Sequence, residues 1–572
     1  MQPTYRMFAA AMLFALTACA APSSRPADMA AQPGASPGAP AQRKAVEILI
    51  RGGPNAFVTA AGGLAGPTAR PSRYFHEFVN GYVTVRDHED EVAPHLAAAL
   101  PSLDNGTWKV LPDGRMEVTW KLRPGIKWHD GKDLTSDDVK FAWEVDSDPL
   151  TQVGASTIAR YLDRVDTPDA QTFVMHWKET HQLGGELGER ELDLLPRHVL
   201  EEPYRADPAG ISNHPYLTSP EAFVGSGPYR PTEWERGSHV VVEAWDGYFL
   251  GRPKIDRITF RVMPDSRTAL ANLLSDASDA SYLALEYPEA RILEHEWSKS
   301  GKGVLQFAPD AVQYLLPQFR AELVTPPDLL NPQIRKALMH AMNRQDLTDG
   351  LDLGPGMVAD STTLPGTPIG DAVGSAVVRY PYDPTRAAAL LADAGWQMGP
   401  DGLLTKDGRR FDVEYRGPPG SATAVVFPLL EQQYRRAGIT LTLRHYLPAN
   451  LEEQVTYPGL FSIGLPANNL VFAQRWHSRF IAGPQTRYAG ANLMGYAEPA
   501  TDAAIDRLLT AVRREDQLRY WGEAWRRITE DVAILPMYYI VGSYPVRKGL
   551  TGLQPRNPLG SPAYQIHLWE AL

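Results

Sequence analysis

The chain has 572 residues, 44% of them hydrophobic, with 67 acidic and 56 basic side chains and a formal net charge of −11. That length is too great for a single compact core, so we expect two or three lobes, and a charged fraction of 22% argues against a membrane-embedded chain. The acidic balance disfavours general nucleic-acid binding, because nothing offsets repulsion from phosphates.

The N-terminus has the pattern of a bacterial export signal. Arg6 is the only charged side chain in residues 1–18, and the apolar run Met7–Leu16 after it is too short to span a bilayer. The run ends in Leu-Thr-Ala-Cys, which resembles the lipobox of bacterial lipoproteins, where cleavage precedes a cysteine that is then lipidated. Cys19 is the only cysteine in the sequence. We therefore predict a lipoprotein signal peptide over residues 1–18 and lipidation of Cys19; the alternative is an ordinary signal with a chance cysteine.

Residues 19–43 predict a disordered tether. The segment is rich in Ala, Pro, Ser, Gly and Gln and has almost no large apolar residues. Such a composition cannot bury enough surface to offset the entropy of ordering. A flexible chain of ~25 residues has a mean reach of roughly 30 Å, enough to hold a folded domain clear of lipid headgroups.

Past the tether, the hydrophobic pattern predicts alternating strands and helices. Met116, Val118 and Trp120 alternate with polar residues, as in a half-buried strand, and Thr135 can cap the helix that follows. The run 411–443 predicts a strand, a helix and a strand, a βαβ unit that implies a parallel sheet. On this pattern the chain belongs to the α/β class, with further elements expected at Ala45–Ile50, Val240–Trp245 and 258–262, after Asn331-Pro332 and Asp383-Pro384, and at 501–512, 518–528 and Ile534–Val541.

Four motifs occur in one order along the chain. They are Trp-Lys-Leu-Arg-Pro-Gly-Ile-Lys-Trp-His-Asp-Gly at 120–131 with Leu-Thr-Ser-Asp-Asp-Val at 134–139; Gly-Ser-Gly-Pro-Tyr at 225–229 with the segment 248–262; 334–344; and 382–396. Together they resemble the family-5 bacterial extracellular solute-binding proteins, the oligopeptide and dipeptide receptors of ABC importers. Each motif also has a structural explanation in turns and helix caps, so the motifs identify the scaffold and leave the ligand open.

The resemblance implies a two-lobed periplasmic-binding-protein fold, type II, of the large class with an extra subdomain and a ligand cleft between the lobes. Strands near 305–316 and 534–541 would cross between the lobes as the hinge. The implied divisions are lobe I from 44–75, 205–308 and 537–572, an inserted subdomain at 76–204, and lobe II at 309–536.

One departure from the family bears on the ligand. In peptide-binding members an aspartate of lobe II receives the peptide amino group, but residues 451–497 contain no aspartate. The corresponding segment carries Asn468 and Asn469, and an amide cannot offer a full charge to an ammonium group. Peptides and other polar or amphipathic solutes therefore both remain candidate ligands.

Candidate ligand contacts come from both lobes and the hinge. Arg416 precedes a Gly-Pro-Pro-Gly-Ser turn and could hold an anion or be a solvated loop residue, and Trp476 and Tyr496 could equally pack in the core. The candidates are Asn55, Phe57 and Ser226 in lobe I, Tyr314 and Gln318 near the hinge, and Arg416, Asn468, Asn469, Trp476, Asn492 and Tyr496 in lobe II.

The sequence favours a binding protein over an enzyme. It contains no Gly-x-Ser-x-Gly elbow and no Walker loop, and the acidic run 87–91 is interpreted as a solvated loop and not a metal site. The resemblance implies a monomeric lipoprotein, anchored in the periplasm or at the cell surface, that delivers a peptide or other small solute to an ABC permease. It implies no cofactor, metal or nucleic acid. The alternatives are a ligand sensor coupled to signalling and, less favoured, an exported hydrolase.

Overall fold

The computed structural model describes residues 44–54, 56–58, 75–87, 91–151, 156, 158–354, 356–447, 450–466, 473–486, 488, 490–553 and 564–572. The chain divides into two compact units, 1–42 and 43–572, and the described residues all belong to the second. The predicted signal peptide and tether, with Cys19, lie outside the described residues. Within the described part of the chain, no helix combines the length and the apolar character needed to span a bilayer.

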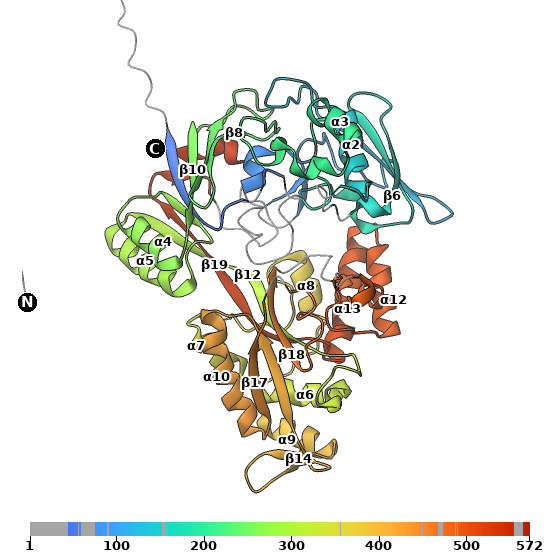
Figure 1. Ribbon diagram of the computed structural model, residues 1–572, viewed down its shortest axis with the longest axis vertical. Helices are drawn as coiled ribbons and strands as arrows, with labels where there is room; N and C mark the ends of the chain where they lie inside the picture. The colour runs from blue at the N-terminus through green and yellow to red at the C-terminus, as the bar shows by residue number, and fades with distance from the viewer. Residues whose placement is uncertain are drawn as a thin grey trace, which may run out of the picture. The chain divides into compact units, whose positions relative to one another are not determined.

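A ten-stranded mixed sheet runs through the second unit (Figure 1). Its strand order is β17-β16-β18-β12-β19-β11-β1-β10-β9-β8. The strands are β1 (Ala45–Arg51), β8 (Tyr229–Glu235), β9 (His239–Ala244), β10 (Arg257–Met263), β11 (Ala280–Tyr282), β12 (Gly303–Pro317), β16 (Asp412–Gly417), β17 (Thr440–His445), β18 (Leu460–Pro466) and β19 (Leu535–Arg547).

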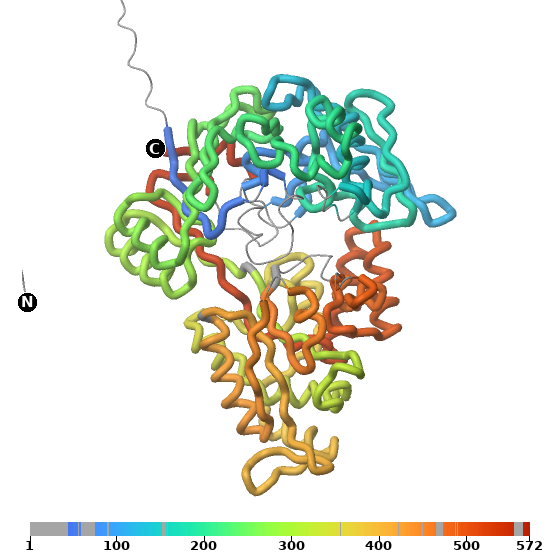
Figure 2. Tube along the Cα trace, viewed as in Figure 1, coloured from blue at the N-terminus to red at the C-terminus, as the bar shows by residue number. Residues whose placement is uncertain are grey.

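The first half of the sheet is built around β1, which the sequence predicted at Ala45–Ile50. β1 pairs in parallel with both β10 and β11, and Figure 2 shows the blue β1 beside the green β10. Ile48 and Ile50 pack in one hydrophobic cluster, whereas Leu49 packs on the opposite face with helices α4 (Ser266–Leu274) and α5 (Tyr287–Ser300). Alternate side chains of a strand point to opposite faces, so this apolar run serves two layers at once.

A separate four-stranded sheet has the order β4-β5-β7-β6. It consists of β4 (Trp108–Val110), β5 (Met116–Lys121), β6 (Leu162–Asp166) and β7 (Thr172–Trp177), accompanied by helices α2 (Ser136–Ser147) and α3 (Arg197–Ala206). The alternation predicted for β5 is confirmed, since Met116, Val118 and Trp120 are buried. The Asp138 carboxylate accepts hydrogen bonds from the backbone N–H of Thr135 (2.8 Å) and of Arg197 (2.9 Å), so it ties the starts of both helices together.

The second half of the large sheet contains the predicted βαβ unit. β16 and β17 pair in parallel and are joined by α10 (Ser421–Arg436). The described residues of this half also form α6 (Pro332–Ala341), α7 (Arg344–Gly350), α8 (Pro368–Gly374), α9 (Pro384–Asp393), α12 (Pro499–Leu509) and α13 (Arg514–Glu530). The predicted caps are confirmed: Asn331 accepts from the N–H of Gln333 (2.9 Å) and Asp383 from that of Arg386 (2.9 Å).

The long strands β12 and β19 belong to both halves of the sheet. Residues 303–309 of β12 pair with 547–541 of β19, and residues 311–315 pair with 540–535. The register shifts twice, so that Asp310 is an extra residue on β12 and Met537 an extra residue on β19. Such bulges bend a strand and increase its twist.

The two ends of β19 pack in different hydrophobic clusters. Tyr544 and Val546 pack in the cluster that contains β1, whereas Leu535, Met537 and Tyr538 pack in a cluster of the other half. Between them, Ile540 and Val541 are only partly buried. Both residues pack against the second cluster, so the two cores contact different ends of the strand pair.

The predicted domain boundaries stay predictions. Those at 308/309 and 536/537 fall inside β12 and β19, and the one at 204/205 falls inside α3. The chain therefore passes from one half to the other within continuous strands and not through loops.

Candidate functional site

Tyr314, one of the two candidates near the predicted hinge, has a hydroxyl without a hydrogen-bond partner among the described residues. It lies on β12 and is 1% exposed, and its hydroxyl makes no hydrogen bond within the described part of the chain. Burial raises the pKa of this hydroxyl, with nearby Arg475 acting in the opposite direction, so the phenol is neutral and can donate a hydrogen bond. A buried hydroxyl without a partner is costly, and the contact of Tyr314 with a ligand stays a prediction.

Trp476 lies beside Tyr314, with ring centroids 6.5 Å apart. Its side chain is fully buried, the indole N–H donates to the carbonyl oxygen of Ala533 (3.3 Å), and the ring packs edge-on against Trp525 at 4.9 Å. These contacts match the core-packing alternative that the sequence left open. Its ligand-contact role stays a prediction.

Gln318 and Arg320 together link three loop segments of the second half by hydrogen bonds. Its amide nitrogen donates to the carbonyl oxygens of Val455 (3.0 Å) and Tyr457 (2.6 Å). Its amide oxygen accepts from the backbone and the guanidinium of Arg320, both at 3.1 Å. Arg320 in turn donates to the carbonyl oxygen of Leu493 (2.9 Å). Both donor and both acceptor positions of this buried amide are used within the protein, so the role of Gln318 in this structure is to hold these loops together.

Asn492 and Tyr496 belong to one tight turn. The Asn492 amide nitrogen donates to the carbonyl oxygens of Tyr496 (2.7 Å) and His477 (3.2 Å), and its oxygen accepts from the N–H of Gly495 (3.0 Å). The Tyr496 hydroxyl is hydrogen-bonded to the Thr501 hydroxyl at 3.1 Å. Both side chains shape the turn, and their contact with a ligand stays a prediction.

Arg416 lies inside β16 and is 5% exposed. Its Nε and Nη2 donate to one carboxylate oxygen of Glu414 at 2.8 and 2.6 Å, and Nη1 donates to the carbonyl oxygen of Glu453 at 2.9 Å. The alternative of a solvated loop arginine is therefore wrong, because Arg416 belongs to the strand itself and is buried. The anion-binding role stays a prediction, and an anion would have to compete with Glu414.

The two described candidates of the first lobe are also buried. Phe57 packs in an aromatic group with Phe223 (4.8 Å between ring centroids) and Trp234 (4.9 Å). The Ser226 hydroxyl accepts from the N–H of Gly81 at 3.1 Å. Asn55, Asn468 and Asn469 lie outside the described residues, so the segment that replaces the family's aspartate is not part of this geometry.

A hydrogen-bonded chain across three strands was missed by the sequence analysis. Gln313 of β12 and Tyr415 of β16 both donate to the hydroxyl of Ser462 on β18, each at 2.8 Å. A Cβ on Gly464 would lie 2.6 Å from the amide oxygen of Gln313, so this glycine makes room for the glutamine. A glycine within a strand was the one signal in the sequence that pointed to this close contact. The order of the strands, which decides that these three residues are neighbours, could not be read from the sequence.

Most of the described candidate residues make hydrogen bonds or packing contacts within the protein that hold its loops and strands in place. Of the eight candidates that the structure describes, only Tyr314 leaves a polar side-chain atom without a partner within the described residues. The structure groups Tyr314 with Trp476, and Gln318 with the turn of Asn492 through Arg320. No group of three His, Cys, Asp or Glu side chains in the described residues could hold a metal ion.

Comparisons with known proteins give a consistent result. The family model described as "Bacterial extracellular solute-binding proteins, family 5 Middle" matches residues 91–469, more than half of the chain. The chain is 24% identical over 500 residues to the oligopeptide-binding protein AppA of Bacillus subtilis (strain 168), covering 85% of each protein. It is 27% identical over 309 residues to the glutathione-binding protein GsiB of Pectobacterium atrosepticum, covering 51% of this chain and 52% of that relative.

Solved structures share the fold. An oligopeptide-binding protein from Thermus thermophilus, complexed with a pentapeptide, superposes with a TM-score of 0.74 at 20% identity, covering 92% of this chain and 96% of that one. NikA from Brucella suis in complex with Fe(III)-EDTA gives a TM-score of 0.74 at 17% identity, covering 92% and 100%. The two-lobed α/β fold expected from the sequence is confirmed.

The unpaired state of the Tyr314 hydroxyl can be tested by a matched pair of substitutions. Tyr314→Phe is expected to leave the free energy of unfolding unchanged or to raise it, because no hydrogen bond is lost. Tyr415→Phe, at an equally buried tyrosine, removes the bond to Ser462 and is expected to cost about 1 kcal/mol. Urea unfolding of both variants measures the difference. An equal loss in the two would show that the Tyr314 hydroxyl already has a partner.

Proposed function

Because the chain belongs to the bacterial extracellular solute-binding proteins of family 5, we propose that it captures a peptide or another small polar or amphipathic solute between its two lobes and delivers it to the permease of an ABC transporter. The observation that carries the proposal is the match of the family over residues 91–469. The β12–β19 pair supports it, because two strands that belong to both lobes allow the lobes to close on a ligand while staying connected.

The class of solute is argued from the relatives and from this chain's departure from them. AppA is named for oligopeptides and a structural relative was solved with a pentapeptide, which supports a peptide. Another relative is named for glutathione, and a further structure holds Fe(III)-EDTA, so the scaffold serves chemically different ligands. The absence of aspartate from residues 451–497 favours a solute that does not depend on a carboxylate partner for a free amino group.

Ligand binding and closure of the lobes are thermodynamically linked. A ligand shifts a two-state equilibrium only by its difference in affinity for the two states, so it stabilises the closed form by contacting both lobes. Tyr314 stands on a strand shared by the lobes, and its hydroxyl can gain in the complex the hydrogen bond that it lacks within the described residues. The chain performs no chemistry on its ligand in this proposal.

Native mass spectrometry of residues 43–572, purified without added ligand, tests the capture function. We expect a discrete adduct that is lost on mild denaturation, since a closed cleft releases a bound solute slowly. The mass of the adduct then narrows the class of solute. Absence of any adduct, together with no thermal stabilisation by peptides, sugars or metal chelates, would contradict the proposal.

The lipid anchor is a separate part of the proposal and rests on Cys19 and the composition of the segment after it. Cys19→Ser is expected to block processing as a lipoprotein and to move the protein from the membrane fraction to the soluble fraction. A matched control adds Ser23→Cys to Cys19→Ser, which restores a thiol at the wrong position and should not restore anchoring. Membrane fractionation and the mass of the mature chain report both outcomes; an unchanged membrane fraction would contradict anchoring.

A further inference from the structure

The two halves of the molecule contact each other at a second place besides the β12–β19 pair. Figure 1 shows α12 and α13 beside the part of the chain that contains β6. The guanidinium of Arg514, in the first turn of α13, donates to a carboxylate oxygen of Glu91 at 2.7 Å. Arg513 lies 3.8 Å from the carboxylate of Asp104. The preceding residue, Val512, packs against the hydrophobic cluster that contains β1. Three consecutive residues of the predicted lobe II therefore contact the other half.

This contact lies far from the strands that join the halves. α13 has 17 residues, so its length is about 25 Å. Arg514 is its first residue, whereas its last residue, Glu530, is followed closely by β19, which begins at Leu535. A small rotation about the strand pair is enlarged at the far end of the helix. The contact can therefore form only when the two halves are close together.

The start of α13 departs from the charges that a helix start prefers. Helix starts favour Ser, Thr, Asp or Asn at the N-cap and acidic side chains in the first turn, because the helix dipole is positive there. Glu515 and Asp516 meet this preference. Arg513, at the N-cap, makes no capping hydrogen bond to a described residue, and Arg514 adds a second positive charge. Such a departure from local rules indicates that another requirement prevails, here the pairing with carboxylates of the other half.

Glu91 is held in position by its own half. It lies directly before β3 (Val92–Pro94), which pairs with β2 (Thr84–Arg86) as a hairpin. The N–H of Asp87 donates to the carbonyl oxygen of Glu91, and the N–H of Glu91 donates to the carboxylate of Asp87, both at 3.0 Å. The acidic run 87–91, interpreted from the sequence as a solvated loop, thus presents a carboxylate to the other half.

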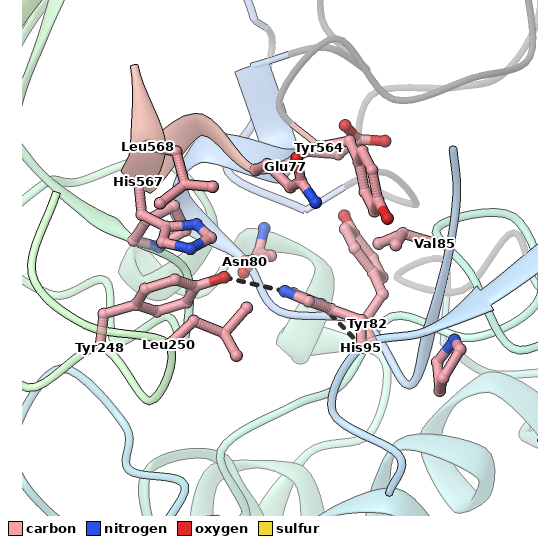
Figure 3. A pocket seen from close by; sticks show the side chains of 13 residues that line it. Glu77, Asn80, Tyr82, Val85, His95, Tyr248, Leu250, Tyr564, His567 and Leu568 are labelled. Carbon is pink, nitrogen blue, oxygen red and sulfur yellow. Dashed lines mark hydrogen bonds between the residues drawn. The ribbon is translucent and has the colours of Figure 1, made fainter. Parts of the chain in front are cut away.

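The rest of the hairpin is also fixed. His95 follows β3, and its ring nitrogen atoms lie 3.1 Å from the carbonyl oxygen of Tyr82 and 2.8 Å from the hydroxyl of Tyr248 (Figure 3). On β2, Arg86 donates two hydrogen bonds to the carboxylate of Glu186, each at 2.7 Å. The hairpin is therefore bound to its own half on both strands. A side chain on such a support loses less freedom when it forms an ion pair, so less of the attraction is offset.

We infer that the Glu91–Arg514 ion pair, with Asp104 and Arg513 beside it, is an electrostatic latch that stabilises the closed arrangement of the two halves. The inference rests on the closure proposed above. The four side chains are between 41% and 84% exposed, so salt screens their attraction. Exposed ion pairs contribute little each, so the latch shifts the balance between open and closed forms and does not lock it. A bound solute can still leave.

Fluorescence energy transfer in the absence of solute tests the latch. The full chain carrying Cys19→Ser has no thiol, so dyes can be attached at Lys109→Cys and Gln397→Cys, two exposed positions in different halves. Bound solute is first removed by unfolding and refolding. Raising the NaCl concentration from about 20 mM to about 500 mM should lower the ratio of closed to open molecules roughly two- to fivefold, because screening weakens the ion pair.

Charge reversal separates the latch from general effects of salt. Arg514→Glu should lower the ratio of closed to open molecules at low salt at least about threefold, because attraction is replaced by repulsion. Adding Glu91→Arg to Arg514→Glu restores opposite charges and should recover most of the ratio. The matched control is Arg519→Glu, at an exposed arginine of the same helix that pairs with Asp516 of that helix. It makes the same change in charge and should leave the ratio unchanged.

The inference is overturned if the double reversal fails to restore closure, if Arg519→Glu lowers the ratio as much as Arg514→Glu, or if energy transfer is the same in every variant at both salt concentrations. No solute takes part in these measurements. A failure of solute capture in the mass-spectrometry test and a failure of the latch are therefore distinguishable.

Discussion

The hydrogen-bonded pairing of β12 with β19 is the constraint on which the rest of the molecule depends. Both strands run through the middle of the ten-stranded sheet, so β11 and β1 are held on one end of the pair and β18 and β16 on the other. A loop connection would leave the two halves free to separate. Paired strands restrict their relative motion to bending and twisting along the pair, and this is the kind of motion that closure of two lobes requires.

The side-chain packing along the pair supports this view. Buried clusters hold the ends of β19, through Tyr544 and Val546 on one side and through Leu535 and Met537 on the other, while Ile540 and Val541 between them are only partly buried. Bending costs least where few buried contacts must change. The extra residues of the two register shifts, Asp310 and Met537, lie close to the same stretch and give each strand a place to change its twist.

The sequence predicted local features well because their causes are local. Asn331 and Asp383 cap helices through hydrogen bonds to N–H groups two or three residues away, and the alternation in β5 places Met116 and Trp120 on the buried face. The roles of candidate site residues depend on distant partners. Gln318 binds carbonyl groups more than 130 residues away, and the pairing that brings Ser462 to Gln313 follows from strand order. The family resemblance predicted the two-lobed fold, but it could not show which way each side chain points.

The central claim, that a solute closes two lobes joined by β12 and β19, can be measured directly by fluorescence energy transfer. The native chain has Cys19 as its only cysteine, so residues 43–572 offer a background without thiols for labelling Lys109→Cys and Gln397→Cys, two exposed positions in different halves. The labelled protein is unfolded to remove bound solute, refolded, and mixed with the small molecules released from the unlabelled protein. The account predicts a shift to one higher-transfer state on binding; thermal stabilisation by the same extract with no change in transfer would contradict it.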